Sequence, residues 1–183
     1  ARRLAEVNPG YGHWALGTLL CLSGDCGAAL EPYHEALSLI PTNPYLHAYL
    51  GVTEAILGND LRALEELRIA ESLWEGEFAA PWMLVQLAYG YGAIGRGEDA
   101  LRVFNRIEGM AEEFSVGAAT WSLAYLAIGD RDSALEWLVT AADDKTPDEG
   151  LIIEFIVRSN HLSDPILDQP EFVEVRSRLG FRE

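Results

Sequence analysis

Basic residues are scarce in this chain of 183 residues, which has 13 Lys and Arg against 29 Asp and Glu and a formal net charge of −16. Residues 4–61 contain neither Lys nor Arg, and Lys145 is the single lysine. A field of this sign repels phosphate, so we expect neither a nucleic-acid partner nor an anionic membrane surface. Arg-rich, Lys-poor usage with abundant Ala and Gly favours a bacterial source.

Cysteine and long apolar runs are also scarce. The two cysteines, Cys21 and Cys26, lie five residues apart, which is not a metal or redox spacing. We expect two buried or half-buried thiols in a reducing compartment, with a local disulfide as the alternative outside the cytoplasm. No apolar run reaches the length of a membrane span and no signal peptide is visible, so we expect a cytoplasmic protein.

Catalytic motifs are missing as well. The chain has no phosphate-binding loop, nucleophile elbow or dinucleotide fingerprint. Its four histidines form no metal-ligand spacing with Cys or Asp, and His13 and His47 lie 34 residues apart, which favours a packing role. Paired carboxylates such as Glu65 and Glu66 are typical of solvated helix faces. We therefore expect no enzymatic activity, no cofactor and no metal.

An internal repeat is the strongest positive feature. Four glycines are each followed five residues later by Ala-Leu, at steps of 34, 37 and 34 residues: Gly24, Gly58, Gly95 and Gly129. Apolar residues recur at steps of three and four on both sides of each Gly, which is typical of amphipathic helices. A period of this size therefore predicts helix–Gly-turn–helix units, with the small Ala where two helices cross closely.

Proline-rich breaks and the repeat register divide the chain into units. Pro41-Thr42-Asn43-Pro44 ends one unit, and Ala80-Pro81 opens another. We expect the end of a preceding repeat helix, four repeats of which the second has a longer loop, and C-terminal capping helices: residues 1–9, 10–43, 44–80, 81–114, 115–148 and 149–183.

The repeat resembles the tetratricopeptide repeat family over roughly residues 10 to 148. In the first helix, the first two units have the family's Leu-Gly pair and the last two have its Tyr: Leu16-Gly17, Leu50-Gly51, Tyr91 and Tyr125. In the second helix, the matching positions hold Ala or an aromatic residue: Tyr33, Phe104, Ala36, Ala70 and Ala141. The Trp of the family's first helix is absent from all four units. The resemblance implies an all-α, right-handed superhelical solenoid that binds other proteins.

The same resemblance implies a concave groove lined by the first helix of each pair. In this register its lining is aromatic and apolar, and the candidate partner-binding residues are Tyr11, Trp14, Tyr45, Tyr49, Trp82, Gln86, Tyr89 and Leu123. Trp14 and Thr18 replace the Lys and Asn with which the family clamps a terminal carboxylate, so we expect that mode to be absent. An amphipathic helix or an apolar peptide suits such a groove, although the aromatics could instead be core.

The last residues suggest a place in a larger protein. Gly150 to Arg158 reads as an apolar capping helix, a short turn follows near Pro165, and a final helix ends at Gly180. This ending is similar to the tails of bacterial multidomain proteins in which such repeats follow a cyclase, a kinase or a DNA-binding domain. We expect a protein-interaction scaffold, the sensing or scaffolding part of a bacterial regulator. The alternatives are a homodimerisation module controlling a fused domain and a small-ligand sensor.

Overall fold

The computed structural model describes residues 8–75, 79–144, 156, 166 and 169–178. The chain divides into two compact units, Ala1–Ala79 and Ala80–Glu183, and each is described here by itself. Four predictions fall outside the described residues: the structure of residues 1–7, most of the helix expected at 150–158, the turn near Pro165, and the end of the final helix at Gly180. Every regular element in the described ranges is helical, which confirms the predicted all-α fold.

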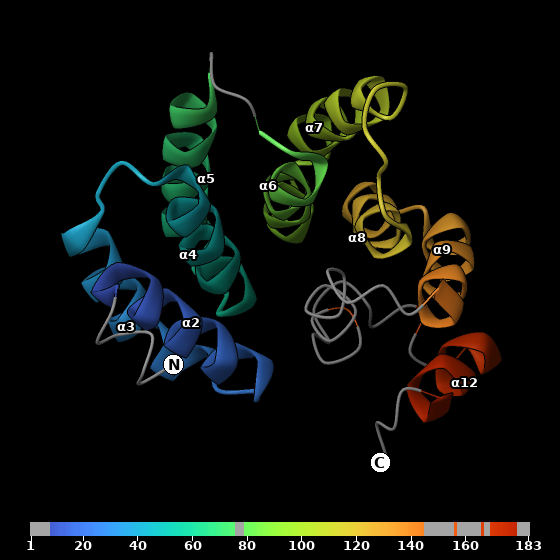
Figure 1. Ribbon diagram of the computed structural model, residues 1–183, viewed down its shortest axis with the longest axis horizontal. Helices are drawn as coiled ribbons and strands as arrows, with labels where there is room; N and C mark the ends of the chain where they lie inside the picture. Colours follow the sequence, from blue (N-terminus) through green and yellow to red (C-terminus); the bar gives the residue numbers. More distant parts are fainter. Residues whose placement is uncertain (1–7, 76–78, 145–155, 157–165, 167–168, 179–183) are drawn as a thin grey trace. The chain divides into compact units, whose positions relative to one another are not determined.

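The first unit consists of two helix pairs. They are α2 (Pro9–Leu22) with α3 (Cys26–Leu39), and α4 (Pro44–Ile56) with α5 (Asp60–Trp74). Within this unit, α2 packs on α3, α3 on α4 and α4 on α5, so the second helix of the first pair lies against the first helix of the second pair (Figure 1). This is the stacking that a repeat of one supersecondary unit predicts.

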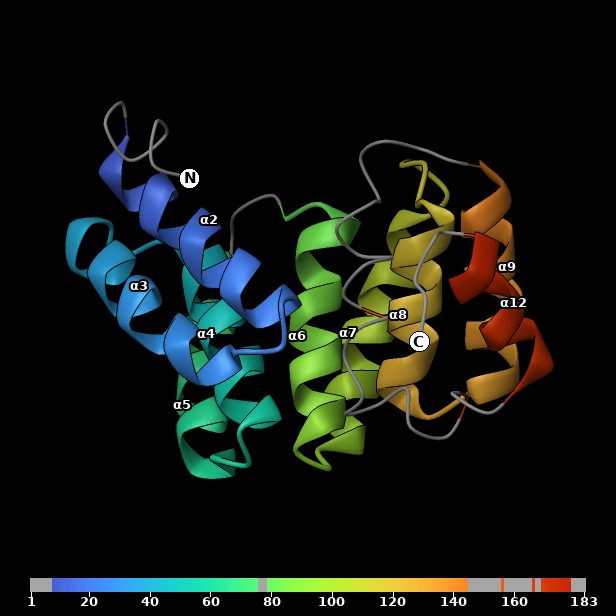
Figure 2. The same cartoon turned by 90° about the horizontal axis from the view of Figure 1, so that it is seen from below.

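The second unit has two further pairs and a terminal helix. The pairs are α6 (Pro81–Ala93) with α7 (Gly97–Met110), and α8 (Ala118–Ile128) with α9 (Arg131–Asp144). Helix α8 packs on both α6 and α7, and α12 (Pro170–Arg178) packs on α9 (Figure 2). The side chains of Phe172 and Val175 in α12 are buried.

The four repeated glycines end the first helix of each pair. Gly24, Gly58, Gly95 and Gly129 have φ values of +93°, +77°, +71° and +80°. The next residue's N–H bonds back to the fifth carbonyl before it, as Asp25 does to Leu20 and Asp130 to Tyr125, at 3.0 Å in both cases. A non-glycine residue rarely adopts such a φ, so the glycines set where each turn occurs.

Local caps fix where helices of the first unit begin. The side chains of Asn8, Asp25 and Asn43 accept backbone hydrogen bonds at the starts of α2, α3 and α4. Pro9 and Pro44 occupy the first helical position of α2 and α4, where no N–H is required. These residues fix where α2 and α4 begin, and these two helices carry most of the candidate site.

Small residues let the helices of each pair approach closely. The four repeated alanines are fully buried: Ala29, Ala63, Ala100 and Ala134. A Cβ at Gly17 would lie 2.8 Å from the Tyr33 ring, and one at Gly51 would lie 2.8 Å from Leu67. The Leu-Gly pairs of α2 and α4 therefore provide the space that the large residue of the paired helix fills.

Candidate interaction surface

Four of the predicted groove residues form one aromatic cluster in the first unit. Tyr11 and Trp14 come from α2, and Tyr45 and Tyr49 come from α4. The Trp14 ring centroid lies 6.4 Å from that of Tyr11, 5.6 Å from that of Tyr45 and 5.8 Å from that of Tyr49. The rings meet at inclined or near-perpendicular angles, which are favourable for aromatic pairs. We call these four residues the aromatic surface.

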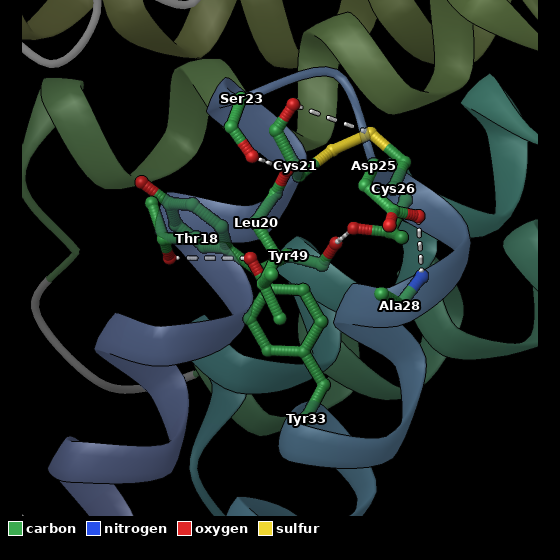
Figure 3. The surroundings of a disulfide bond; sticks show 10 residues. Thr18, Leu20, Cys21, Ser23, Asp25, Cys26, Ala28, Tyr33 and Tyr49 are labelled. Atoms are coloured by element: carbon green, nitrogen blue, oxygen red, sulfur yellow. Dashed lines mark hydrogen bonds between the residues drawn. A yellow bond between two sulfur atoms is a disulfide. The ribbon is translucent and has the colours of Figure 1, made fainter. Parts of the chain in front are cut away.

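Two pairs of hydroxyl groups lie within the cluster and beside it. Tyr45 donates a hydrogen bond of 2.9 Å to the Tyr49 hydroxyl, and the Thr18 and Tyr33 hydroxyls lie 3.1 Å apart (Figure 3). Burial raises the pKa of Tyr45 to about 12 and also raises the pKa of Tyr33 and of Tyr49. These phenols are therefore protonated at neutral pH, and their hydrogen bonds hold the rings in place without adding charge.

The members of the aromatic surface differ in accessibility. Tyr11 is 46% exposed, while Trp14, Tyr45 and Tyr49 are half-buried. The Trp14 Nε1 atom is buried and finds no hydrogen-bond partner among the described residues. The accessible part of the Trp14 side chain therefore consists of ring carbons, which suits contact with apolar groups or with a cation rather than with a hydrogen-bond acceptor.

The predicted groove residues of the second unit lie at different depths. Trp82 is 45% exposed, whereas Gln86, Tyr89 and Leu123 are buried. A buried side chain offers no surface to a partner, so Gln86, Tyr89 and Leu123 are not available for partner contact. The sequence register identified the helices on which they lie, but it did not indicate how deeply neighbouring helices cover them.

A second aromatic group was not among the predicted site residues. Trp121 contacts Phe104, Tyr125 and Trp137, with ring centroids 6.0 to 6.1 Å apart, and links α7, α8 and α9. Trp121 and Tyr125 are four residues apart in α8, which places their side chains on one face of the helix. That spacing is the sequence signal that could have found the group.

Two histidines connect the helices of the first unit. His13 in α2 pairs with Glu35 in α3, and His47 in α4 pairs with Glu66 in α5, each with a nitrogen–oxygen distance of 2.6 Å. The other ring nitrogen of His47 lies 3.0 Å from the Pro41 carbonyl oxygen. Although the two histidines occupy equivalent positions of successive repeats, their partners do not. Both contacts join the two helices of a pair.

The expectation of two free thiols is wrong, because Cys21 and Cys26 form a disulfide in the structure (Figure 3). Cys21 lies in the last turn of α2 and Cys26 is the first residue of α3. The left-handed turn at Gly24 folds the start of α3 back onto the end of α2, which brings the two sulfur atoms together. The spacing of five residues alone does not indicate that the turn at Gly24 brings Cys21 and Cys26 together.

Among the residues that the structure describes, no group of three or more His, Cys, Asp or Glu is placed to hold a metal ion. None of the helices that the structure describes has both the length and the apolar character needed to cross a membrane.

Comparison with known proteins found a repeat protein. No family model matches the chain. The chain is 31% identical over 110 residues to tetratricopeptide repeat protein 36 from Danio rerio. The aligned residues make up 60% of this chain and 59% of the relative's length. The similarity agrees with the helix pairs and glycine turns described above.

Proposed function

We propose that this chain is a non-enzymatic scaffold of the tetratricopeptide repeat family that binds an apolar segment of a partner protein on its aromatic surface. The single observation that carries the proposal is the clustering of Tyr11, Trp14, Tyr45 and Tyr49 from two successive first helices, with Tyr11 half exposed. The similarity to a tetratricopeptide repeat protein supports the scaffold role. In a larger regulator, this surface would be the sensing or scaffolding part.

The physical basis is a rigid aromatic platform on two packed helices. Tyr and Trp bury a large area with few rotatable bonds, so they contribute strongly to protein interfaces. Ring contacts and the Tyr45–Tyr49 hydrogen bond already fix the orientations of Trp14, Tyr45 and Tyr49. A partner that inserts an apolar side chain against these rings therefore loses little entropy from the scaffold side.

The test is a peptide selection followed by affinity measurement. Peptides are selected from a displayed random library on the full chain, and the best is titrated by fluorescence anisotropy. The variant Tyr11→Ser should weaken binding by about tenfold, which corresponds to the loss of one interface anchor. Leu101→Ser is the matched control, because Leu101 is 47% exposed on α7. Equal affinity in the two variants, or no selected peptide, would exclude this binding surface.

A second candidate function is self-association through α2. Leu16 and Leu19 on this helix are 41% and 52% exposed, whereas Leu50, the equivalent of Leu16 in the next repeat, is 1% exposed. Leu50 is covered by Ala29 and Tyr33 of α3, so a second element could cover Leu16 in the same way. Sedimentation velocity over a concentration series tests this. A dimer that Leu16→Gln/Leu19→Gln dissociates supports it, and a concentration-independent monomer excludes it.

A further inference from the structure

The helices that carry the aromatic surface, α2 and α4, and the helix α3 between them are poor in positive charge. Residues 4–61, which include all of α2, α3 and α4, contain six Asp and Glu and no Lys or Arg. Helix α2 itself carries no Asp, Glu, Lys or Arg. No basic side chain of this stretch can therefore cover the rings, and no carboxylate of α2 lies beside them. The His13 ring of α2 pairs with Glu35 of α3.

Tyr11 and Trp14 form a right-angled corner on α2. Their rings are inclined by 85° with centroids 6.4 Å apart, and Tyr11 is half exposed. A cation is attracted by an aromatic face when it lies within about 6 Å of the ring centroid. At the observed separation, one cation can satisfy this condition for both rings.

We propose that the corner formed by Tyr11 and Trp14 binds an arginine side chain of the partner polypeptide. This inference rests on the proposed function and specifies the chemistry of the partner: a segment that carries arginine beside its apolar residues. The acidic chain attracts such a segment over longer distances, and the two rings hold its guanidinium at contact. The proposal attributes the contact with the guanidinium to the ring faces of Tyr11 and Trp14, since α2 itself supplies no carboxylate for an ion pair.

Arginine fits the corner better than lysine. The guanidinium is planar and more weakly hydrated than an ammonium group, so it stacks on an aromatic face at a smaller desolvation cost. The buried Nε1 of Trp14 leaves ring carbons as the accessible indole surface, which is the part that a stacked guanidinium contacts.

The experiment compares three synthetic amphipathic peptides that share one apolar stripe of leucines. Their remaining positions carry arginine, its neutral isostere citrulline, or glutamate, and binding to the full chain is measured by fluorescence anisotropy at 0.15 M salt. The arginine peptide should bind more tightly than the citrulline peptide, and the glutamate peptide least tightly. The ring contribution to the arginine preference should be about two- to fivefold.

Charge-neutral variants separate the rings from the general acidity of the chain. Tyr11→Leu/Trp14→Leu leaves the net charge unchanged and should reduce the arginine-to-citrulline ratio by that two- to fivefold factor. Tyr11→Leu alone is the second variant, to be used if the double variant does not fold, and Leu101→Ser is the control that should keep the full ratio.

Each outcome has a distinct meaning. A ratio that falls in the ring variants but not in the control supports the proposal. An unchanged ratio in a folded ring variant overturns it, because the acidic field alone would then explain the preference. Equal binding of the arginine and citrulline peptides overturns it while the proposed function stands. If none of the selected or synthetic peptides binds, the proposed function fails and this inference fails with it.

Discussion

His47 lies between two acceptors, with Nδ1 2.6 Å from a Glu66 carboxylate oxygen and Nε2 3.0 Å from the Pro41 carbonyl oxygen. A neutral imidazole has one N–H, so only the protonated ring can donate to both groups. Burial by itself lowers the pKa of His47, but the bonds to Glu66 and Pro41 and the Glu66 charge outweigh it, and the net pKa is raised above 6.5. When it is protonated, His47 is a charged connection between α4, α5 and the preceding turn.

This arrangement predicts that the first unit loses stability as the pH rises. A group whose folded-state pKa is raised stabilises the fold fully below its unfolded pKa, and the contribution is lost as the pH passes through the folded value. At the acid end of the profile, His47→Gln should be less stable than wild type by roughly 1 kcal/mol of urea unfolding free energy. From pH 6 upward, this difference should shrink, because wild type loses the stabilisation that the protonated His47 provides. His34→Gln, an exposed position on α3, should follow wild type. Parallel pH profiles for wild type and His47→Gln would contradict the assignment.

Two glycines of the second unit should respond oppositely to alanine. A Cβ at Gly92 in α6 would overlap the Ala127 carbonyl of α8 and lie 3.0 Å from the Ala127 backbone carbon and Cα, whereas one at Gly109 in α7 would meet no atom within 4 Å. Gly92→Ala should lower the unfolding free energy by on the order of 2 kcal/mol, because α6 and α8 must separate.

Gly109→Ala is the matched control for that substitution. It should raise the unfolding free energy by about 0.5–1 kcal/mol, since alanine loses less backbone entropy in a helix. Thermal and urea unfolding followed by circular dichroism measures both variants. A neutral effect of Gly92→Ala would show that α6 and α8 do not approach as closely as described.

Opening the Cys21–Cys26 disulfide should have a modest effect. The bond closes a short loop, so its loss should cost at most about 2 kcal/mol of unfolding free energy in the chain-entropy description. Urea unfolding of wild type with and without a reductant measures this cost. The double variant Cys21→Ala/Cys26→Ala should be insensitive to reductant. If wild type is insensitive too, the cysteines are not bonded in solution.

Much of the fold could be predicted because residues close together in the sequence determine each turn and each helix crossing of the repeat. The glycines that must adopt a positive φ and the alanines at close helix crossings recur at fixed spacing, so the sequence shows the helix pairs directly. The Cys21–Cys26 disulfide is only the alternative in the sequence analysis, because its formation depends on how the Gly24 turn folds the chain back. Gln86, Tyr89 and Leu123 were placed on the correct helices, but their depth depends on packing that a register does not contain.

The candidate site was predictable in part for the same reason. Tyr11 and Tyr45 occupy equivalent positions of two successive first helices, Trp14 and Tyr49 lie on the same two helices, and the structure brings the four rings together. The different partners of His13 and His47 were not predictable, because Glu35 and Glu66 are not equivalent in the repeat.

The most direct test of the aromatic surface is hydrogen exchange on the full chain with and without a selected peptide. The account predicts that the added protection falls in residues 9–22 and 44–56, which form α2 and α4, and that Tyr11→Ser reduces it. Protection confined to other helices, with none in α2 and α4, would contradict the proposal that partners bind on the aromatic surface.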